Sequence, residues 1–259
     1  MTLSTPTYQQ TRQAWRDIWS GTEFDRELTA LGYKRYQEVL NTYLPYLDKS
    51  IPTLEAGCGP GQVVYYLRQQ GYNTVGLDYA PEALKPTLIR FPTLPLHMGD
   101  VHHLPYPTDT FGGYLSFGVV EHFEHGPTLA LAEAYRVLRP GGKLVLTVPH
   151  PQIVEDLYKL VNRLFPSRQN RLGPRAEYYE RTYSHQELTA IVQQVGFDIT
   201  LVKPVGHSYT FYGLHRFFRR ADGYYDTSPL AEFAATLTRR VLPWSTAFAN
   251  MIIAEKPHK

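Results

Sequence analysis

Apolar side chains recur at three- and four-residue steps in the first part of the chain, between residues 8 and 47. This period is typical of helices that bury one face. We therefore predict one or two helices in this region. The positions that carry the period are Leu28, Leu31, Tyr36, Val39, Leu40, Tyr43 and Leu47.

From Ile51 onward, short apolar runs alternate with helical stretches. Strands are predicted at the start of LEAGCGPG and in YNTVGLDYA, PLHMGDV, FGGYLSFGVVEH, KLVLTVPH, DITLVKPV and AFANMIIAEKP. Helices are predicted after the glycine cluster, from PEAL, in PTLALAEAYRVLRPGG up to Pro140, around 153–165, and in SHQELTAIVQQVGF. Such alternation predicts a doubly wound α/β fold, in which a parallel sheet is covered on both faces.

Composition limits the classes of protein that fit. Of 259 residues, 43% are apolar, which suits a compact fold, and a net charge of +2 gives no sign of a nucleic-acid-binding protein. The single cysteine, Cys58, excludes an intrachain disulfide and a multi-cysteine zinc site. The N-terminal residues lack the features of a secretory signal, and no apolar stretch is long enough to span a membrane. We expect a cytoplasmic protein and leave its oligomeric state open.

A glycine-rich turn and two acids point to a nucleoside site. Gly57, Gly59 and Gly61 allow a sharp turn and close approach of a ligand. Asp78 ends the second strand about 20 residues later, where a carboxylate can accept both hydroxyls of a ribose. The third glycine of the dinucleotide fingerprint is missing, because Gln62 stands in its place. Asp100 and the backbone of the next residue could read the edge of an adenine, so adenosine without phosphates is the indicated ligand.

In these segments the sequence resembles the class I S-adenosylmethionine-dependent methyltransferases, in particular the small-molecule, type 11-like group. The motifs LEAGCGPG, VGLDYA, GDVHHLPYPTDTFGGYLSFGVVEHF and EAYRVLRPGGKLVLTVPH follow in the family's order within residues 51–150. The resemblance implies a three-layer sheet of seven strands, mostly parallel with an antiparallel last strand. Phe111 is followed by Gly112 where the family usually has an acid, and Asp109 is a candidate substitute.

The resemblance also implies the residues that bind the cofactor. The glycines would line its methionine and sugar, Glu55 would support the turn and the amino group, and Asp78 would hold the ribose. Tyr79 would lie against the adenine, with Asp100 and Val101 reading its edge. The full set of predicted cofactor-binding residues is Glu55, Gly57, Cys58, Gly59, Gly61, Asp78, Tyr79, Asp100, Val101, Phe117 and Gly118.

Other reactive side chains have less specific interpretations. Cys58 is better explained as a small packed residue than as a thiolate. His97, His102 and His103 lack the spacing of a metal site, so no metal is expected. Glu121, His122 and His150 follow the fourth and fifth strands, so they should lie at the ligand-binding edge of the sheet. His122 and His150 are the candidate general bases.

Aromatic and basic residues gather late in the chain. Tyr178, Tyr179, Tyr183, Tyr209, Phe211, Tyr212, Phe217 and Phe218 either belong to the core or line an acceptor pocket. Five arginines, Arg216, Arg219, Arg220, Arg239 and Arg240, form either a solvated face or a surface for an anionic acceptor or lipid headgroups. Peripheral membrane contact therefore stays open.

We predict a single methyltransferase domain over residues 1–259 that moves a methyl group from S-adenosylmethionine to an O, N or C nucleophile of a small organic acceptor, leaving S-adenosylhomocysteine. Residues 1–48 would form a helical lid and 49–150 the cofactor-binding core, while 151–183 and 205–246 would cap the acceptor site. Two alternatives remain: a catalytically silent module that binds S-adenosylmethionine or adenosine, and an NAD(P)-dependent oxidoreductase.

Overall fold

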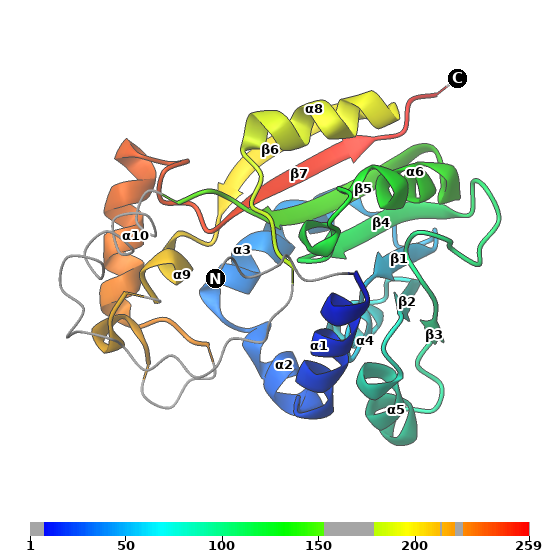
Figure 1. Ribbon diagram of the computed structural model, residues 1–259, viewed down its shortest axis with the longest axis horizontal. Coiled ribbons are helices and arrows are strands. Elements are labelled where there is room, and N and C mark those ends of the chain that lie inside the picture. Colours follow the sequence, from blue (N-terminus) through cyan, green and yellow to red (C-terminus); the bar gives the residue numbers. More distant parts are fainter. Residues whose placement is uncertain (1–7, 153–178, 213, 221–224, 259) are drawn as a thin grey trace.

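The structure is a computed structural model that describes residues 8–152, 179–212, 214–220 and 225–258. At its centre is a seven-stranded sheet with the order β3-β2-β1-β4-β5-β7-β6 (Figure 1). The first five strands pair in parallel, and β7 is antiparallel to both β5 and β6. This confirms the predicted sheet and its antiparallel last strand. The strands are β1 (Thr53–Ala56), β2 (Thr74–Asp78), β3 (Leu96–Met98), β4 (Phe111–Phe117), β5 (Leu138–Pro149), β6 (Asp198–Val205) and β7 (Ala249–Glu255).

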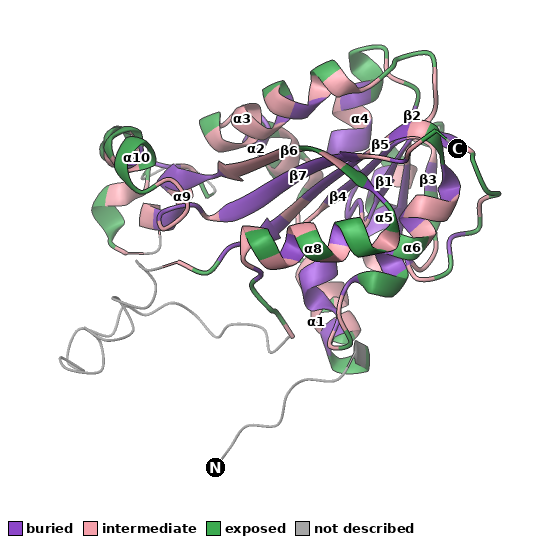
Figure 2. Ribbon diagram, turned by 90° about the horizontal axis from the view of Figure 1, so that it is seen from above, coloured by how far each residue is buried: buried purple, intermediate pink, exposed green. Residues whose placement is uncertain are grey.

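Helices cover both faces of the sheet, as the alternating pattern predicts (Figure 2). The helices α3 and α4 pack on one face, and α6 and α8 pack on the other. The bounds are α1 (Tyr8–Ser20), α2 (Phe24–Ala30), α3 (Lys34–Tyr43), α4 (Gln62–Gln69), α5 (Pro81–Arg90), α6 (Thr128–Val137), α8 (His185–Val195), α9 (His207–Tyr212) and α10 (Pro229–Val241).

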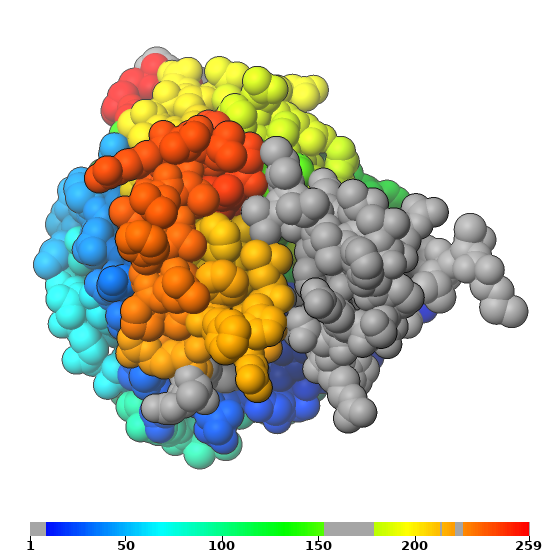
Figure 3. All heavy atoms as spheres, turned by 90° about the vertical axis from the view of Figure 1, so that its left-hand side faces the viewer, coloured from blue at the N-terminus to red at the C-terminus, as the bar shows by residue number. Residues whose placement is uncertain are grey.

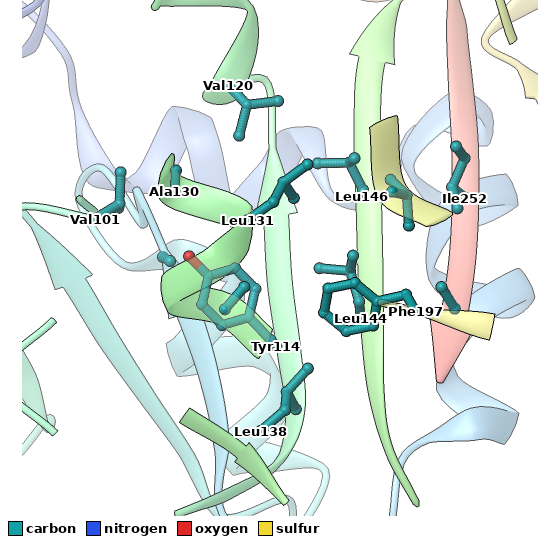
Figure 4. Close-up of a cluster of buried hydrophobic side chains, with 14 of the residues drawn as sticks. Val101, Tyr114, Val120, Ala130, Leu131, Leu138, Leu144, Leu146, Phe197 and Ile252 are labelled. Atoms are coloured by element: carbon teal, nitrogen blue, oxygen red, sulfur yellow. The ribbon is translucent and has the colours of Figure 1, made fainter. Parts of the chain in front are cut away.

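The two cores follow from the alternation of side chains along each strand. Leu144 and Leu146 of β5 point into the core beneath α6 and α8, while Val145 points into the core beneath α3 and α4. Figure 4 shows the first core, where Leu131 lies beside Leu146 of β5 and Phe197 lies beside Leu144. Burial of apolar side chains on both faces of β4, β5 and β7 fixes the register of these central strands.

The N-terminal helical period was predicted to form one or two helices, and the structure divides it into α1, α2 and α3. The breaks fall at the turns that contain Gly21 and Gly32, where backbone N–H groups donate to the carbonyls of Ile18 and Thr29. The helix α8 fits its prediction at both ends. Ser184 accepts a hydrogen bond from the Glu187 N–H at its start, and Gly196 ends it with a φ of 115°.

The predicted end of α6 is wrong. The helix was expected to stop at Pro140, but it ends at Val137, and Pro140 belongs to β5. Phe111 pairs with Leu138 and Gly113 with Lys143, so the residues between them bulge out of the ladder. The bulge is stabilised by tertiary contacts, because the N–H of Gly141 donates to the carbonyl of Lys256, past the end of β7.

Asp109 takes part in the same corner. Its Oδ1 accepts a hydrogen bond from the Lys256 ammonium at 2.7 Å, and that ammonium also donates to the carbonyl of Leu138 at 2.7 Å. The carboxylate therefore links the turn before β4 to the end of β7.

The helices α9 and α10, with the short 3-10 turn Arg216–Phe218 between them, lie together at one end of the molecule (Figure 3). Ser228 caps α10 by accepting a hydrogen bond from the Ala231 N–H. The helix predicted around residues 153–165 and the loop that follows it lie outside the described residues.

Candidate active site

The glycine-rich turn between β1 and α4 depends on left-handed backbone conformations. Gly57, Gly59 and Gly61 have φ angles of 79°, 52° and 79°, which residues with a Cβ atom adopt only at a cost. The turn is also tightly packed, because a Cβ on Gly59 would lie 2.8 Å from the Trp19 ring. It is joined to the sheet by the N–H of Gly57, which donates to the carbonyl of Leu77 at 2.8 Å.

Asp78 ends β2 beside this turn, and its carboxylate accepts hydrogen bonds from the backbone. The N–H of Gly59 donates to Oδ2 at 2.8 Å, and the N–H of Ala80 donates to Oδ1 at 2.9 Å. Burial raises the pKa of Asp78, and these backbone hydrogen bonds oppose the rise. Each carboxylate oxygen has a second lone pair. The group can therefore accept further hydrogen bonds from ligand hydroxyls.

Asp100, after β3, is bound to the N-terminal helix α1. Its Oδ2 accepts a hydrogen bond from Nη1 of Arg12 at 3.3 Å, and its Oδ1 accepts from Nδ1 of His102 at 2.8 Å. The Arg12 guanidinium lies 4.6 Å from the centre of the Tyr79 ring. The Tyr79 hydroxyl in turn donates to the Arg12 carbonyl at 3.2 Å. Arg12 thus joins α1 to the carboxyl ends of both β2 and β3.

Two further contacts hold α1 in place. Arg16 makes two hydrogen bonds to the carboxylate of Glu82 in α5, at 2.9 and 2.6 Å, which lower the pKa of Glu82 to about 2. The hydroxyl of Thr11 accepts from the N–H of Tyr179 at 3.0 Å. The helix α1 is therefore attached to three separate parts of the core.

These elements enclose a cavity of about 340 Å³. Gly61 does not line it, contrary to the sequence-based prediction, because it lies on the far side of the turn, where a Cβ would meet the Leu96 side chain at 2.7 Å. The other predicted cofactor-binding residues all line the cavity: Glu55, Gly57, Cys58, Gly59, Asp78, Tyr79, Asp100, Val101, Phe117 and Gly118.

The sequence analysis missed much of the cavity wall. A signal was present for one part of it, since Thr11, Trp15 and Trp19 stand four residues apart and so share one face of α1. No comparable signal identifies Gln62. In the described part of residues 205–246, which were predicted to cap the acceptor site, no residue lines this cavity. The missed lining residues are Thr11, Arg12, Trp15, Trp19, Glu27, Leu31, Tyr36, Val39, Leu40, Tyr43, Gln62, Val63, Val119, Phe123 and Thr147.

Three buried polar atoms of the cavity wall have no hydrogen-bond partner. They are Oε2 of Glu55, the hydroxyl oxygen of Tyr43 and Oε1 of Gln62. Burial raises the pKa of Glu55 well above its usual value, the neighbouring charge of Asp78 adds to the rise, and a hydrogen bond from the Val64 backbone opposes it. Buried polar groups without partners cost about 1–3 kcal/mol each. A ligand that brings N–H donors to these atoms would remove that cost.

Cys58 has the properties of a packed thiol. It is 2% exposed, and burial together with the charges of Asp78 and Glu55 raises the pKa of its thiol well above the usual value. The partial positive charge at the start of α4 does not outweigh these effects.

The two candidate bases lie in different surroundings. His122 lines the cavity, with its Nδ1 donating to the Tyr179 carbonyl at 2.8 Å, and burial lowers its pKa to about 4. His150 does not line the cavity. Its Nδ1 donates to Oδ1 of Asn250 in β7 at 2.9 Å, and its ring packs against Trp244. The structure therefore brings only His122 to the cavity.

Glu121, beside His122 on the 3-10 turn after β4, is buried with Oε2 unpartnered. Burial raises its pKa to about 8, and the nearby charge of Glu180 adds to the rise. It does not line the cavity, but its backbone carbonyl accepts from the N–H of Arg181 at 3.0 Å. The 3-10 turn thus anchors the segment that begins at residue 179.

Most late aromatic residues pack away from the cavity. Tyr183 is fully buried in the core, and Tyr178 lies outside the described residues. Tyr209 of α9 stacks on the Arg35 guanidinium at 3.9 Å from its ring centre, and the same guanidinium lies 4.5 Å from the ring centre of Tyr36, which lines the cavity. The C-terminal helices therefore touch the cavity wall through α3.

The described residues hold no cluster of three or more histidine, cysteine, aspartate or glutamate side chains placed to bind a metal ion. None of their helices combines the length and the apolar character needed to span a bilayer.

Comparison with known proteins gives the family. Residues 54–146 match the protein family described as methyltransferase domain. A probable S-adenosylmethionine-dependent methyltransferase of Mycolicibacterium smegmatis is 28% identical over 167 residues, 64% of this chain and 59% of the relative's length. This chain therefore spans less than two thirds of that relative.

Solved structures share the fold. The 1,6-didemethyltoxoflavin-N1-methyltransferase of Burkholderia thailandensis, solved with 1,6-didemethyltoxoflavin and S-adenosylhomocysteine, superposes with a TM-score of 0.62 at 16% identity, covering 100% of this chain and 94% of its own. The [4+2]-cyclase SpnF superposes with a TM-score of 0.60 at 18% identity over 100% of both chains. At such identities the likeness concerns the fold alone. The matched segment and the strand order show that residues 54–146 form a methyltransferase domain of the class I S-adenosylmethionine-dependent type.

Proposed function

We propose that this protein binds S-adenosylmethionine in the cavity beneath α1 and catalyses transfer of its methyl group to a small organic acceptor. The observation that carries the proposal is that the glycine turn, Asp78, Asp100 and Glu55 line one cavity. When bound, S-adenosylmethionine supplies an activated methyl group on a sulfonium. The demethylated product is S-adenosylhomocysteine.

The side chains along the cavity fit the parts of this cofactor. Asp78, Asp100 and Val101 all line the cavity. In this proposal Asp78 offers lone pairs to the ribose hydroxyls, and Asp100 with the Val101 backbone reads the adenine edge. The unpartnered oxygens of Glu55 and Gln62 suit the ammonium of the methionine portion. Glu55 would ionise when an ammonium approaches, because the opposite charge favours its carboxylate form.

The protein contributes mainly by positioning and by excluding water. Trp15, Trp19 and Phe117 supply apolar walls in which a donor and an acceptor can be held at reacting distance. An acceptor that arrives protonated must lose its proton as the new bond to carbon forms. His122 is the candidate to receive it. With a pKa of about 4 it is neutral at pH 7 but a weak base, so an acceptor that needs no deprotonation fits this cavity best.

Titration calorimetry tests the proposal on the intact chain with S-adenosylmethionine, S-adenosylhomocysteine and NADH. We expect binding of the first two and none of NADH. Asp78→Ala should weaken binding by about 1.5–3 kcal/mol, because a charge-assisted hydrogen-bond pair is lost. The matched control is Asp198→Ala, at an exposed carboxylate at the start of β6. Tight NADH binding, or no effect of Asp78→Ala, would refute the proposal.

A second candidate is a silent cofactor-binding module, since the fold is shared with a protein described as a cyclase. Incubation with radiolabelled S-adenosylmethionine and a broad panel of amines, phenols and carboxylic acids separates the two. Labelled product supports methyl transfer, whereas cofactor binding with no transfer to any acceptor supports the silent module.

A further inference from the structure

An apolar stripe runs along the outward face of α10. Leu230, Phe233, Leu237 and Val241 are 50%, 63%, 54% and 76% exposed. Their spacing of three, four and four residues places them on one face of the helix. The buried side of α10 is formed instead by small residues, including Ala231 and Ala235. This helix thus turns its large apolar side chains outward, which is the reverse of an ordinary surface helix.

The stripe continues beyond the helix. Leu242, which follows α10, is 51% exposed, and Phe217 of the preceding 3-10 turn is 63% exposed. Phe217 lies near the start of α10, because its carbonyl accepts a hydrogen bond from the Ser228 hydroxyl at 2.6 Å. Figure 3 shows α10 and the elements before it side by side on one face of the molecule. Contiguous apolar surface of this kind marks a contact site. We call these six residues, 217, 230, 233, 237, 241 and 242, the α10 stripe.

The charge around the α10 stripe selects the kind of partner. Residues 205–246 carry five arginines and three carboxylates, a net charge of +2. Arg220 pairs with Asp226 and Arg239 pairs with Glu38, so Arg216 and Arg240 are the arginines that bear on the stripe. The Arg216 guanidinium lies over the exposed Phe217 ring at 5.6 Å. Arg240 follows Leu237 by three residues, which makes them neighbours on the helix surface. The guanidinium groups of Arg216 and Arg240 would attract an anionic surface.

We infer that the α10 stripe is a docking surface for an anionic lipid bilayer. Apolar side chains with arginines beside them match an interface in which the side chains enter the acyl boundary and the guanidinium groups meet lipid phosphates. The absence of a membrane-spanning helix among the described residues is consistent with peripheral attachment. The inference does not depend on the proposed methyl transfer, because it rests on α10 and its neighbours.

The end of the molecule that carries the α10 stripe is connected to the cavity wall by one set of contacts. Tyr209 of α9 and Tyr36 of the cavity wall lie against the same Arg35 guanidinium. The helix α9, which packs against α10, therefore contacts the cavity wall through Arg35.

Vesicle sedimentation of the intact protein tests the inference. The probes are vesicles of phosphatidylcholine alone and vesicles that also contain phosphatidylglycerol. We expect binding to the anionic vesicles, with a marked decrease at high salt. The double variant Phe233→Ser with Leu237→Ser should lower the apparent partition coefficient about tenfold or more. The double variant Arg216→Gln with Arg240→Gln should lower it about tenfold, with most of the salt dependence lost.

The matched control is Leu129→Ser on α6, an equally exposed leucine outside the stripe. It should bind like the wild type. All the substituted side chains are exposed, so thermal transitions should stay unchanged. If the variant with serines at 233 and 237 shows no thermal unfolding transition, vesicle binding of the variant with glutamines at 216 and 240 decides the outcome.

Two results would overturn the inference. One is wild-type protein that stays in solution with both kinds of vesicle. The other is a dimer in analytical ultracentrifugation that the serine variant dissociates, because a second copy would then cover the stripe.

Discussion

Arg12 and Asp100 form an ion pair across 3.3 Å between the N-terminal helix α1 and the loop after β3, although 88 residues separate them in the chain. Both residues line the cavity. The same Asp100 carboxylate is the group predicted to read an adenine edge. The pair therefore links the position of α1 to the loop after β3 in the cavity wall.

Loss of this pair should loosen the attachment of α1 to the core. Because both side chains are partly exposed, the pair contributes at most about 1 kcal/mol. Arg12→Gln should therefore speed hydrogen exchange in α1 and release of S-adenosylhomocysteine by up to about fivefold, measured by mass spectrometry and stopped-flow mixing. Arg26→Gln, which breaks an exposed pair with Glu23 away from the cavity, should change neither rate. Unaltered exchange in α1 after Arg12→Gln would contradict this role of the pair.

Glu55 should show opposite effects on stability and on binding. Its pKa is raised by burial, so Glu55→Gln removes an unfavourable buried charge and should leave the free energy of unfolding at pH 8 equal or higher. The same change removes a charged acceptor for the cofactor ammonium. We therefore expect binding to weaken by about 1.5–3 kcal/mol in calorimetry.

Glu23→Gln is the matched control for Glu55→Gln, because Glu23 is exposed. It should affect neither quantity. A Glu55→Gln protein that binds S-adenosylmethionine like the wild type would show that the unpartnered carboxylate oxygen does not meet the ligand.

Two glycine-to-alanine changes separate backbone strain from packing. Gly71 has a φ of 85° and open space around it, so Gly71→Ala should cost only the strain, about 1 kcal/mol. Gly59 has a φ of 52°, and its new Cβ would also meet Trp19 at 2.8 Å. Gly59→Ala should therefore lower the free energy of unfolding in urea more than Gly71→Ala does. It should also weaken cofactor binding. Equal unfolding midpoints for the two variants would show that Trp19 moves aside without cost.

Stability should fall as the pH rises through the range in which Glu121 ionises. The folded protein holds its proton up to a pKa of about 8, whereas the unfolded chain loses it near 4.3. The unfolded state therefore binds fewer protons between these values, and the free energy of unfolding decreases there with increasing pH. Glu121→Gln should remove this contribution. The change in the free energy of unfolding between pH 5 and pH 8, measured in urea, should then be smaller by a few kcal/mol than in the wild type.

The opposite dependence is expected from His122 at lower pH. Its folded pKa of about 4 lies below the ordinary 6.5, so stability should be lost as the pH falls from 6.5 toward 4. His122→Gln should reduce that loss. An unchanged acid limb in the variant would contradict a buried neutral ring.

Much of the fold could be predicted because it depends on local patterns. Period-two and period-3.6 apolar positions predicted the strands and the helices, and Ser184 with Gly196 marked the ends of α8. The end of α6 could not be predicted in the same way. Pro140 and the glycines after it are ordinary helix stops, yet they bulge within β5 because the backbone of Lys256 pairs with them.

The grouping of Asp78 and Asp100 in one cavity wall was also predictable, because the carboxyl ends of parallel strands meet at one edge of the sheet. Asp78 and Asp100 had to lie there once their strands were known. His150 shows the limit of that reasoning. It follows β5 at the same edge, but pairing of β5 with antiparallel β7 brings Asn250 beside it and directs its ring away from the cavity.

The sequence by itself determined the order of strands and helices, the left-handed glycine turn and the acids that follow β2 and β3. Each depends on neighbours in the chain or on the strict alternation of a strand. Only the tertiary structure decided that α1 lines the cavity, that Glu55, Tyr43 and Gln62 share it with unpartnered oxygens, and that α10 turns its large apolar side chains outward. These are relationships between residues far apart in the chain, and packing sets them once the whole sheet has formed.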